Sequence, residues 1–523
     1  MINIVDLPIG KKIARNTLFS IIGFAWQGIT LLFLIPYIIS RVGNEQYGIW
    51  ALLVAVVTYF SLIDVGGNAT LTKYVAEYDS RRDVESLTML INNGALFYIG
   101  VVAAILLIGF TLSEPILSLV NIPLQLRDEA KVVYSFALVI FSLTMFSNVF
   151  TSVISGLQRI DILNGVLIAA NALRVIGVIV VLEIGWSIRG IVISDTIVSL
   201  CTLTLMMFFA KRLYPSLSVN PLAYNRQMLR RIVGFGAKLQ VSNVSELINF
   251  QLDKILLSRF LGVQFVTFYD VGSRLLKNAR GFPLMVLSSL VPAVSELSSS
   301  DNYEKLFVLY RGASKYLVAF GAFVFGFFFV GAANIVELWV GPGYGLSVAT
   351  MRILSAGYFI NLITGVVAYA SVGIGKPGYL VRVALIQTLG NIFLSITLIH
   401  AVGYYGAAIG TTVALSIGGL YFIGSFGKEV RDTLRNFFHT ILLRPLVATV
   451  AAGGLTWLID VIAVQLFFSP GVRVHYIPLL ILNFLVFGSV YIFLIKTLRH
   501  FEKEDWQMLR RNLPPRLQRF ILE

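Results

Sequence analysis

Ionisable side chains inside long apolar stretches are the residues of this chain with the clearest chemistry. Such a group costs roughly 2.5–3.5 kcal/mol or more at membrane depth unless it is paired or faces water. Arg274, Lys277 and Arg280 follow an i, i+3, i+6 spacing, which spreads them over about 120° of a helix. Three cations on one broad face favour the wall of an anion-filled cavity, where arginine can bind an oxyanion through two parallel hydrogen bonds.

Two other interpretations of these three cations remain open. Asp270 precedes Arg274 by one helical turn, and carboxylates at Glu246 or Asp253 could neutralise the other cations. The apolar stretch could also be misplaced relative to the membrane, which would put Arg280 near its surface.

Single charges occur in other apolar stretches. Those predicted to line the same cavity, and so to contact an anionic substrate, are Lys238, Glu246, Lys315 and Arg174. A carboxylate partner such as Asp195 is the alternative for Arg174. Arg352 is a further intramembrane charge without an assigned role, and Lys254 is expected to extend its ammonium group to the nearby membrane surface.

Two carboxylates, Asp64 and Asp253, are candidates for ion coupling because a buried carboxylate can bind H⁺ or Na⁺. A structural ion pair or a helix cap is the alternative for each. No catalytic residue, metal site or other cofactor is predicted. Cys201 is the single cysteine and the four histidines lie far apart in sequence, so neither residue type shows the spacing of metal ligands. The sequence also lacks phosphate-loop, HExxH and GxSxG motifs.

The composition explains why charged positions are so few. Of the 523 residues, 57% are hydrophobic and 13% are charged, against about 25% charged residues in an ordinary soluble domain. So little charge cannot coat a soluble fold, which excludes a soluble enzyme, a disordered chain and a nucleic-acid-binding protein. We attribute the net charge of +14 to the excess of Lys and Arg in the cytoplasmic loops of membrane proteins.

Apolar windows of about 20 residues recur along the chain and predict an all-α polytopic membrane protein. About 14 transmembrane helices are expected, over residues 16–40, 46–67, 88–112, 133–155, 162–184, 190–210, 232–258, 264–295, 312–333, 346–374, 383–401, 404–424, 445–468 and 476–495. Pro283 and Pro292 should kink the span over 264–295. Lys and Arg concentrate before the first span and in every second loop, which places both termini in the cytoplasm.

The first twelve spans are predicted to form two sets of six that repeat at an offset of 218 or 219 residues. Gly156 matches Gly375, and each ends a span. Gly185 matches Gly403, and each begins a tight turn. Both copies would share one orientation around an axis along the membrane normal, whereas the alternative is a bundle of unrelated helices with evenly spaced loops. The expected domains are a six-helix lobe over 1–212, a cytoplasmic linker over 213–231, a second six-helix lobe over 232–425, two additional helices over 426–496 and a basic cytoplasmic tail over 497–523.

Three segments resemble bacterial polysaccharide flippases of the Wzx type, from a superfamily that also holds multidrug exporters and peptidoglycan-precursor flippases. Residues 62–78, LIDVGGNATLTKYVAEY, resemble the end of the second span in that family. Residues 253–262, DKILLSRFLG, are similar to its seventh span, and residues 155–159, SGLQR, to the turn after its fourth. The resemblance covers about residues 12–425 and includes Asp64 and Asp253.

The resemblance implies a V-shaped pair of lobes that works by alternating access and is not an enzyme. The implied substrate is an undecaprenyl-pyrophosphate-linked oligosaccharide for O-antigen or exopolysaccharide, moved from the cytoplasmic to the periplasmic leaflet of the bacterial inner membrane. Membrane lipids surround the spans, and the tail is expected to lie on the membrane surface. Docking of the tail to a polysaccharide polymerase or glycosyltransferase is the alternative.

Two other functions remain as alternatives. An ion-coupled exporter of small cationic compounds predicts an anionic cavity, against which the cluster at Arg274 counts. A membrane-embedded polysaccharide polymerase or glycosyltransferase predicts a large external loop with catalytic groups, and the longest expected external loop, 113–132, is short.

Overall fold

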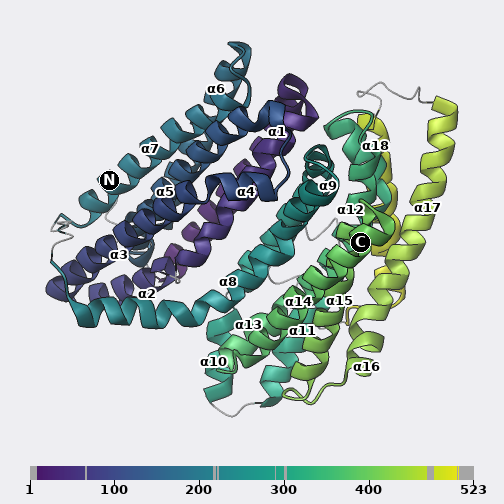
Figure 1. Ribbon diagram of the computed structural model, residues 1–523. Helices are drawn as coiled ribbons and strands as arrows, with labels where there is room; N and C mark the ends of the chain where they lie inside the picture. Colours follow the sequence, from purple (N-terminus) through teal and green to yellow (C-terminus); the bar gives the residue numbers. More distant parts are fainter. Residues whose placement is uncertain are drawn as a thin grey trace. The chain divides into compact units, whose positions relative to one another are not determined.

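The computed structural model of the chain describes residues 9–64, 67–215, 220, 223–288, 290–299, 303–467, 476–502 and 505. This described part consists of helices and turns without a β-strand, which confirms the predicted all-α class (Figure 1). The chain forms two compact units. Unit 1 comprises Met1–Asp270 with Ser395–Ala407, and unit 2 comprises Val271–Leu394 with Ala408–Glu523. The division into lobes predicted around residues 213–231 stays a prediction.

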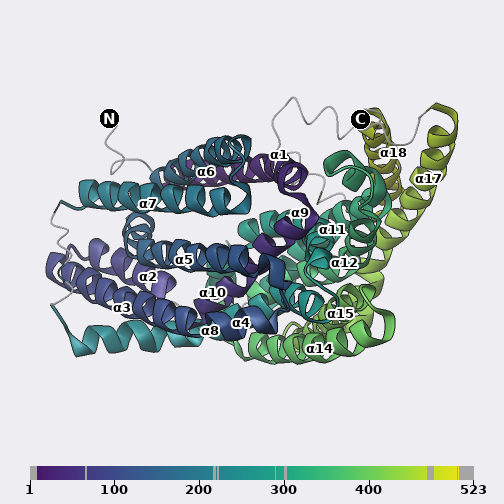
Figure 2. The same cartoon turned by 45° about the horizontal axis from the view of Figure 1, so that its top comes forward.

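Unit 1 is a bundle of long helices. Its elements are α1 (Ile9–Thr58), α2 (Gly67–Ser80), α3 (Val84–Thr111), α4 (Ser113–Leu119), α5 (Arg127–Gly156), α6 (Ile160–Glu183), α7 (Ser187–Leu213) and α8 (Arg226–Phe260), with 3₁₀ turns at Tyr59–Ile63 and Leu124–Leu126. Helix α7 packs against both α5 and α6, and α1 packs against the same two helices (Figure 2). Helix α8 lies against α1, α2 and α3.

Unit 2 is organised around α11 (Tyr303–Trp339), which packs against α12 (Gly345–Ile363), α13 (Gly365–Gly373), α17 (Leu443–Phe467) and α18 (Tyr476–Thr497). Its other elements are α10 (Leu290–Ser299), α16 (Leu434–Phe437) and a π-helical turn at Phe438–Leu442. Helices α9 (Gln264–Leu287), α14 (Gly378–Val402) and α15 (Tyr405–Gly427) contribute residues to both units.

Eleven of the described helices are long and apolar enough to cross a membrane, or twelve if the bent pair α9–α10 is a single span. The fourteen expected spans differ from this count for two reasons. The spans expected over 16–40 and 46–67 lie on the two sides of a kink in α1 at Gly43, whose backbone is not helical (φ 80°, ψ 173°), and the count takes Leu18–Ile63 as one span. Helix α8, expected as the span 232–258, does not qualify, and it carries several ionisable residues between positions 238 and 254.

The bends and tight turns expected from glycine and proline lie close to their predicted places. Helices α9 and α10 meet at an angle of 40° after Leu287, between the two prolines. Pro292 falls in the first turn of α10, where a missing N–H leaves no helical bond unmade. Gly185 (φ 87°) and Gly403 (φ 64°) adopt the left-handed conformation that ends a helix, and side chains with a Cβ disfavour it.

Candidate functional site

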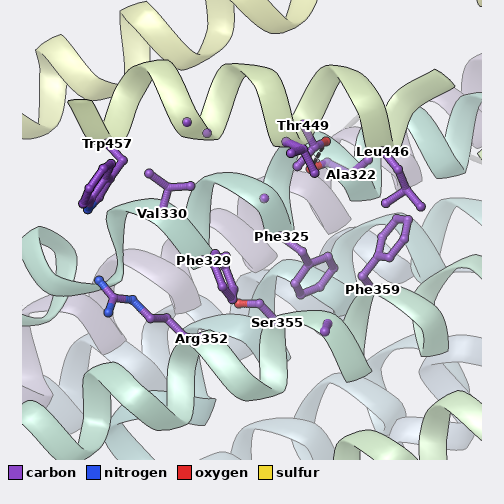
Figure 3. A pocket seen from close by; sticks show the side chains of 15 residues that line it. Ala322, Phe325, Phe329, Val330, Arg352, Ser355, Phe359, Leu446, Thr449 and Trp457 are labelled. Atoms are coloured by element: carbon purple, nitrogen blue, oxygen red, sulfur yellow. Dashed lines mark hydrogen bonds between the residues drawn. The ribbon is translucent and has the colours of Figure 1, made fainter. Parts of the chain in front are cut away.

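An elongated groove lies within unit 2, between α11, α12 and α17 (Figure 3). Its volume of about 630 Å³ falls in the range of small-molecule sites. The walls are mainly aromatic and aliphatic, formed by Phe325, Phe329, Phe359, Leu446 and Trp457 together with smaller residues. Leu446 and Trp457 lie on one helix, so their separation in sequence gives the groove a length of about 16 Å along α17.

Small residues on α11 and α17 shape this groove. A Cβ added at Gly326 would lie 2.3 Å from Cγ2 of Thr449, so the two helices touch here. The hydroxyl of Thr449 also donates to the carbonyl of Ala322 at 3.2 Å. A Cβ at Gly454, in contrast, would meet nothing within 4 Å. The helices therefore touch near Thr449 and leave open space beside Gly454.

Arg352 of α12 is the one charged side chain among the described residues that line the groove. It is exposed, and no carboxylate in the described part of the chain lies within 4.0 Å of it. Figure 3 shows its guanidinium at the end of the groove that holds Trp457, away from Leu446 and Phe359. An apolar groove with one guanidinium at its end matches an amphiphile that has an anionic head group and an apolar chain.

A second hollow, of about 580 Å³, lies between α1 and α6 in unit 1. Its described lining includes Trp26, Phe33 and Tyr37 and contains no charged side chain. Without a charge it offers no group that would select one amphiphile over a membrane lipid. The groove beside Arg352 is therefore the better candidate site.

The three cations predicted to form an anion-binding wall lie half-buried on α9. Nε of Arg280 donates to Oδ1 of Asn361 in α12 at 2.6 Å. The backbone carbonyl of Arg274 accepts a hydrogen bond from Asn278, one turn further along α9, at 3.0 Å. The role of Arg274, Lys277 and Arg280 toward an anion stays a prediction.

Two other predicted cavity cations are held by carboxylates. Arg174 makes two hydrogen bonds to Asp195, from Nε at 2.7 Å and from Nη2 at 3.1 Å. Nζ of Lys315 lies 2.5 Å from Oδ2 of Asp505 and 3.6 Å from Oε1 of Glu502, both beyond α18. The contacts of Arg174 match the pairing with Asp195 given as its alternative, and the place of both cations in a cavity lining stays a prediction.

The remaining two candidates lie on α8. Glu246 is exposed. The side chain of Lys238 lies outside the described residues. Their predicted place in a cavity lining stays a prediction.

Asp253 is only 1% exposed and has oxygen-bearing neighbours within unit 1. The hydroxyl of Tyr269 donates to its Oδ2, and Oγ of Ser395 lies 3.3 Å from its Oδ1. The same Oγ lies 3.5 Å from the carbonyl oxygen of Ala407. Oxygen ligands of this kind suit hard cations, so the geometry is compatible with the ion-coupling role that the sequence predicts.

Asp64 caps a helix. Its Oδ1 accepts the backbone N–H of Gly67 at 2.9 Å, at the first residue of α2, and the hydroxyl of Tyr98 donates to its Oδ2 at 3.1 Å. These bonds satisfy an otherwise unpaired N–H at the start of α2. The helix-cap alternative thus describes the observed contacts, and a coupling role stays a prediction.

Lys254 does not extend to the membrane surface as expected. It is 5% exposed and its Nζ lies 2.5 Å from Oδ1 of Asp270, which is 2% exposed. The hydroxyl of Tyr47 donates to Oδ2 of the same carboxylate at 2.7 Å. The expectation was wrong because the partner comes from the next helix, which sequence spacing on α8 alone cannot reveal.

The sequence profile described as polysaccharide biosynthesis protein matches residues 13–298, which is more than half of the chain. The chain belongs to this family. Membership confirms the resemblance found in the sequence, and Asp64, Asp253 and the Lys254–Asp270 pair all lie within the matched range.

Two curated relatives of the chain are named as a transporter and a flippase. The "Putative O-antigen transporter" of Shigella flexneri is 17% identical over 419 residues, which cover 78% of this chain and 96% of the relative. The "Probable flippase AglR" of Haloferax volcanii is 28% identical over 184 residues, which cover 34% of this chain and 38% of the relative.

Two solved structures share the fold of this family member. One is "Lipid II flippase MurJ, inward closed conformation", with a TM-score of 0.72, 17% identity, and coverage of 92% of this chain and 99% of that one. The other is an inward-facing multidrug resistance MATE family transporter of the MOP superfamily, with a TM-score of 0.69, 14% identity, and coverage of 77% and 94%. At such identities the likeness shows the fold alone.

Sequence reasoning noted Arg352 as an intramembrane charge but did not place it in the site. One signal could have done so, because no Asp or Glu occurs between Glu337 and Glu429. An arginine this far in sequence from any carboxylate cannot form an ion pair within its own helix or with its sequence neighbours. A lone intramembrane cation of that kind indicates a ligand contact or a water-filled site.

Proposed function

We propose that this protein is a flippase for an undecaprenyl-pyrophosphate-linked oligosaccharide in the bacterial cytoplasmic membrane. It would carry the substrate from the cytoplasmic to the periplasmic leaflet by alternating access. The observation that supports this best is Arg352, exposed at one end of an apolar groove about 16 Å long. In this proposal the guanidinium binds the pyrophosphate and the aromatic walls contact the polyprenyl chain.

The head group rather than the chain must provide selectivity in this groove. Inside a bilayer, lipid tails are as apolar as a polyprenyl chain, so moving that chain from lipid to Phe325 and Phe329 gains packing but no hydrophobic driving force. A guanidinium and a phosphoryl anion form charge-assisted, bidentate hydrogen bonds that a zwitterionic lipid matches less well. Arg352 is therefore expected to decide which lipid the groove retains.

The transport cycle needs no covalent chemistry, so we assign no catalytic residue. We propose both termini in the cytoplasm, a six-helix lobe over 1–212 and a second over 232–425 that rock against each other. Asp253 with its neighbouring hydroxyls is the proposed site for the coupling ion, H⁺ or Na⁺. The anion wall on α9 would guide the pyrophosphate, and the basic tail over 497–523 would rest on the membrane surface.

An exporter of small cationic compounds is less well supported. The multidrug transporters with a similar fold keep this alternative in view. A cationic substrate would need a carboxylate in the groove, whereas the charged group in its described lining is Arg352. A guanidinium there would repel such a substrate.

The test is a strain that lacks the chromosomal copy and carries variants of this protein. Arg352→Ala should reduce polysaccharide display at least about tenfold and let lipid-linked repeat units accumulate on the cytoplasmic leaflet, since truncating one partner of a charge pair costs about 2–5 kcal/mol. Arg352→Lys should restore display only in part, because an ammonium lacks the two parallel donors.

Arg382→Ala is the matched control, because Arg382 is also exposed but lies on α14 over the ring of Tyr379, outside the groove lining. It should leave display unchanged. Normal display in a well-expressed Arg352→Ala strain would refute the substrate role of the groove. Normal display combined with drug hypersensitivity in the deletion strain would favour the exporter.

A further inference from the structure

Three polar side chains from three helices meet near one end of α11, α17 and α18 in unit 2. Oδ1 of Asp460 in α17 accepts hydrogen bonds from the amide of Asn334 in α11 and from the amide of Asn483 in α18, both at 2.6 Å. Asn334 is 5% exposed and Asn483 is 1% exposed. Each residue lies about 7–10 Å from the end of its helix, so the three side chains share one depth inside the spans.

The charge of Asp460 is not balanced by these contacts. Among the described residues no Lys, Arg or His nitrogen lies within 4.0 Å of its carboxylate, and both of its hydrogen-bond donors are neutral amides. A carboxylate inside a membrane span is costly without a counter-charge. The cluster therefore needs a positive charge that the described side chains do not supply.

The amide of Asn483 gives a second indication that the cluster lacks a ligand. Its Oδ1 is buried and has no hydrogen-bond partner, although buried acceptors are nearly always satisfied. This oxygen belongs to the same amide whose nitrogen reaches Asp460, so it lies within a few ångströms of the carboxylate. A cation beside Asp460 would satisfy the unpartnered oxygen and the unbalanced charge together.

We propose that Asp460, Asn334 and Asn483 form a binding site for a monovalent alkali cation, with Na⁺ as the ligand to test. In the observed orientation Oδ2 of Asp460 takes no hydrogen bond from the described residues, and Oδ1 of Asn483 has no partner. These two oxygens are the proposed protein ligands, while the amide of Asn334 holds the carboxylate in place. Water reaches Asp460, which is half-buried, and completes the coordination.

The charge and ligand types select a monovalent hard cation. One carboxylate and two neutral amides carry a single negative charge, which Na⁺ cancels, whereas Ca²⁺ or Mg²⁺ would leave a net positive charge inside the membrane. Transition metals prefer nitrogen or sulfur ligands. No group of three or more His, Cys, Asp or Glu residues that could hold a metal ion exists in the searched part of the chain.

Cation binding at this place would fasten α17 and α18 to α11. Trp457 lies one turn before Asp460 and Val330 one turn before Asn334, and both line the groove beside Arg352. The cation would thus stabilise one wall of the groove without touching its occupant. This inference does not depend on which lipid the groove binds, because the cation site is assembled by side chains outside the groove lining.

The experiment measures thermal unfolding of the purified full-length protein in nanodiscs, in NaCl or in choline chloride of equal concentration. The wild-type protein should unfold at a higher temperature in NaCl, with a saturable dependence on Na⁺ concentration. Asp460→Asn should raise the apparent Kd for Na⁺ at least about tenfold. Asp195→Asn is the matched control, because it removes a carboxylate in another span that already has Arg174 as its partner, and it should leave the Na⁺ shift unchanged.

Two results would overturn the proposal. One is an identical unfolding temperature of the wild-type protein in the two salts, which needs no variant to fold. The other is an unchanged Na⁺ shift in Asp460→Asn.

Asn483→Asp provides a third measurement, since a second carboxylate should let Ca²⁺ stabilise the variant but not the wild-type protein. Equal responses of the two proteins to Ca²⁺ would contradict a cation contact at Asn483.

Discussion

Removing either partner of the Lys254–Asp270 pair should destabilise the protein more than removing both. The two side chains are 7% and 3% exposed, so the charge that remains after Lys254→Met or Asp270→Asn loses its 2.5 Å partner and has little access to water. Breaking a buried pair in this way costs about 3–5 kcal/mol, whereas replacing both partners by neutral groups of similar size is often neutral or stabilising. An asparagine at 270 still accepts the hydroxyl of Tyr47, which keeps that hydrogen bond out of the comparison.

The assay is a double-mutant cycle on unfolding of the purified protein in one detergent. Each single variant should lose about 3–5 kcal/mol and the double variant clearly less than either, which gives a coupling energy of about 3 kcal/mol or more. The exposed pair of Arg127 and Glu114 is the control, because its side chains are 32% and 53% exposed, and Arg127→Gln should cost no more than about 1 kcal/mol. A double variant as unstable as the sum of the single variants would refute the reasoning.

Three further predictions concern unit 2. Gly326→Ala should destabilise the protein, because the new methyl group would lie 2.3 Å from a threonine side chain of α17, whereas Gly454→Ala has open space and should unfold like the wild-type protein. Burial lowers the pKa of His500 to about 4, so the fold favours the neutral ring. The contribution of His500 to the free energy of unfolding is complete above about pH 6.5 and is lost as the pH falls toward 4. His500→Gln should therefore flatten the dependence of stability on pH in that range. Lys315→Gln and Asp505→Asn should each speed limited proteolysis after α18, because each removes the 2.5 Å ion pair that holds this segment on α11. Cleavage of the variants at the rate of the wild-type protein would contradict that role.

Hydropathy was sufficient to predict the fold class and most spans, because lipid leaves the backbone few other structures. Its limits appear at α1 and α8. In α1 the two expected spans are helices on either side of a kink at Gly43, since a glycine can change the chain direction without a loop of polar residues to mark the boundary. Helix α8 was expected from its apolar residues, although its ionisable residues keep it outside a strict hydropathy criterion. Length and apolarity therefore predict helices better than they count membrane crossings.

Ion-pair partners were predictable only when they were close in sequence. Asp195 was foreseen for Arg174, since adjacent helices joined by a short turn bring such residues together. The partner of Lys315 lies 190 residues away, and no periodicity reports a contact of that kind. Helical spacing predicts Asp270 as a partner of Arg274, and the structure adds a partner from another helix, because tertiary packing at the α8–α9 turn brings the ammonium of Lys254 to the same carboxylate. Helical spacing identifies neighbours on one helix, whereas a site inside a membrane is built from several.

Helix α11 connects the two proposed sites of unit 2 with the segment that follows α18. Its first half holds the segment after α18 through Lys315, its middle forms the groove through Phe325 and Phe329, and its last turns contribute Asn334 to the proposed cation site. Helix α18 packs on it closely, with the hydroxyl of Tyr491 donating to a backbone carbonyl of α11 at 2.7 Å. Helix α17 therefore contributes to both proposed sites of unit 2, and α18 contributes to the proposed cation site. Without α17 the groove loses a wall, and without α18 the carboxylate on α17 loses an amide that fixes its position.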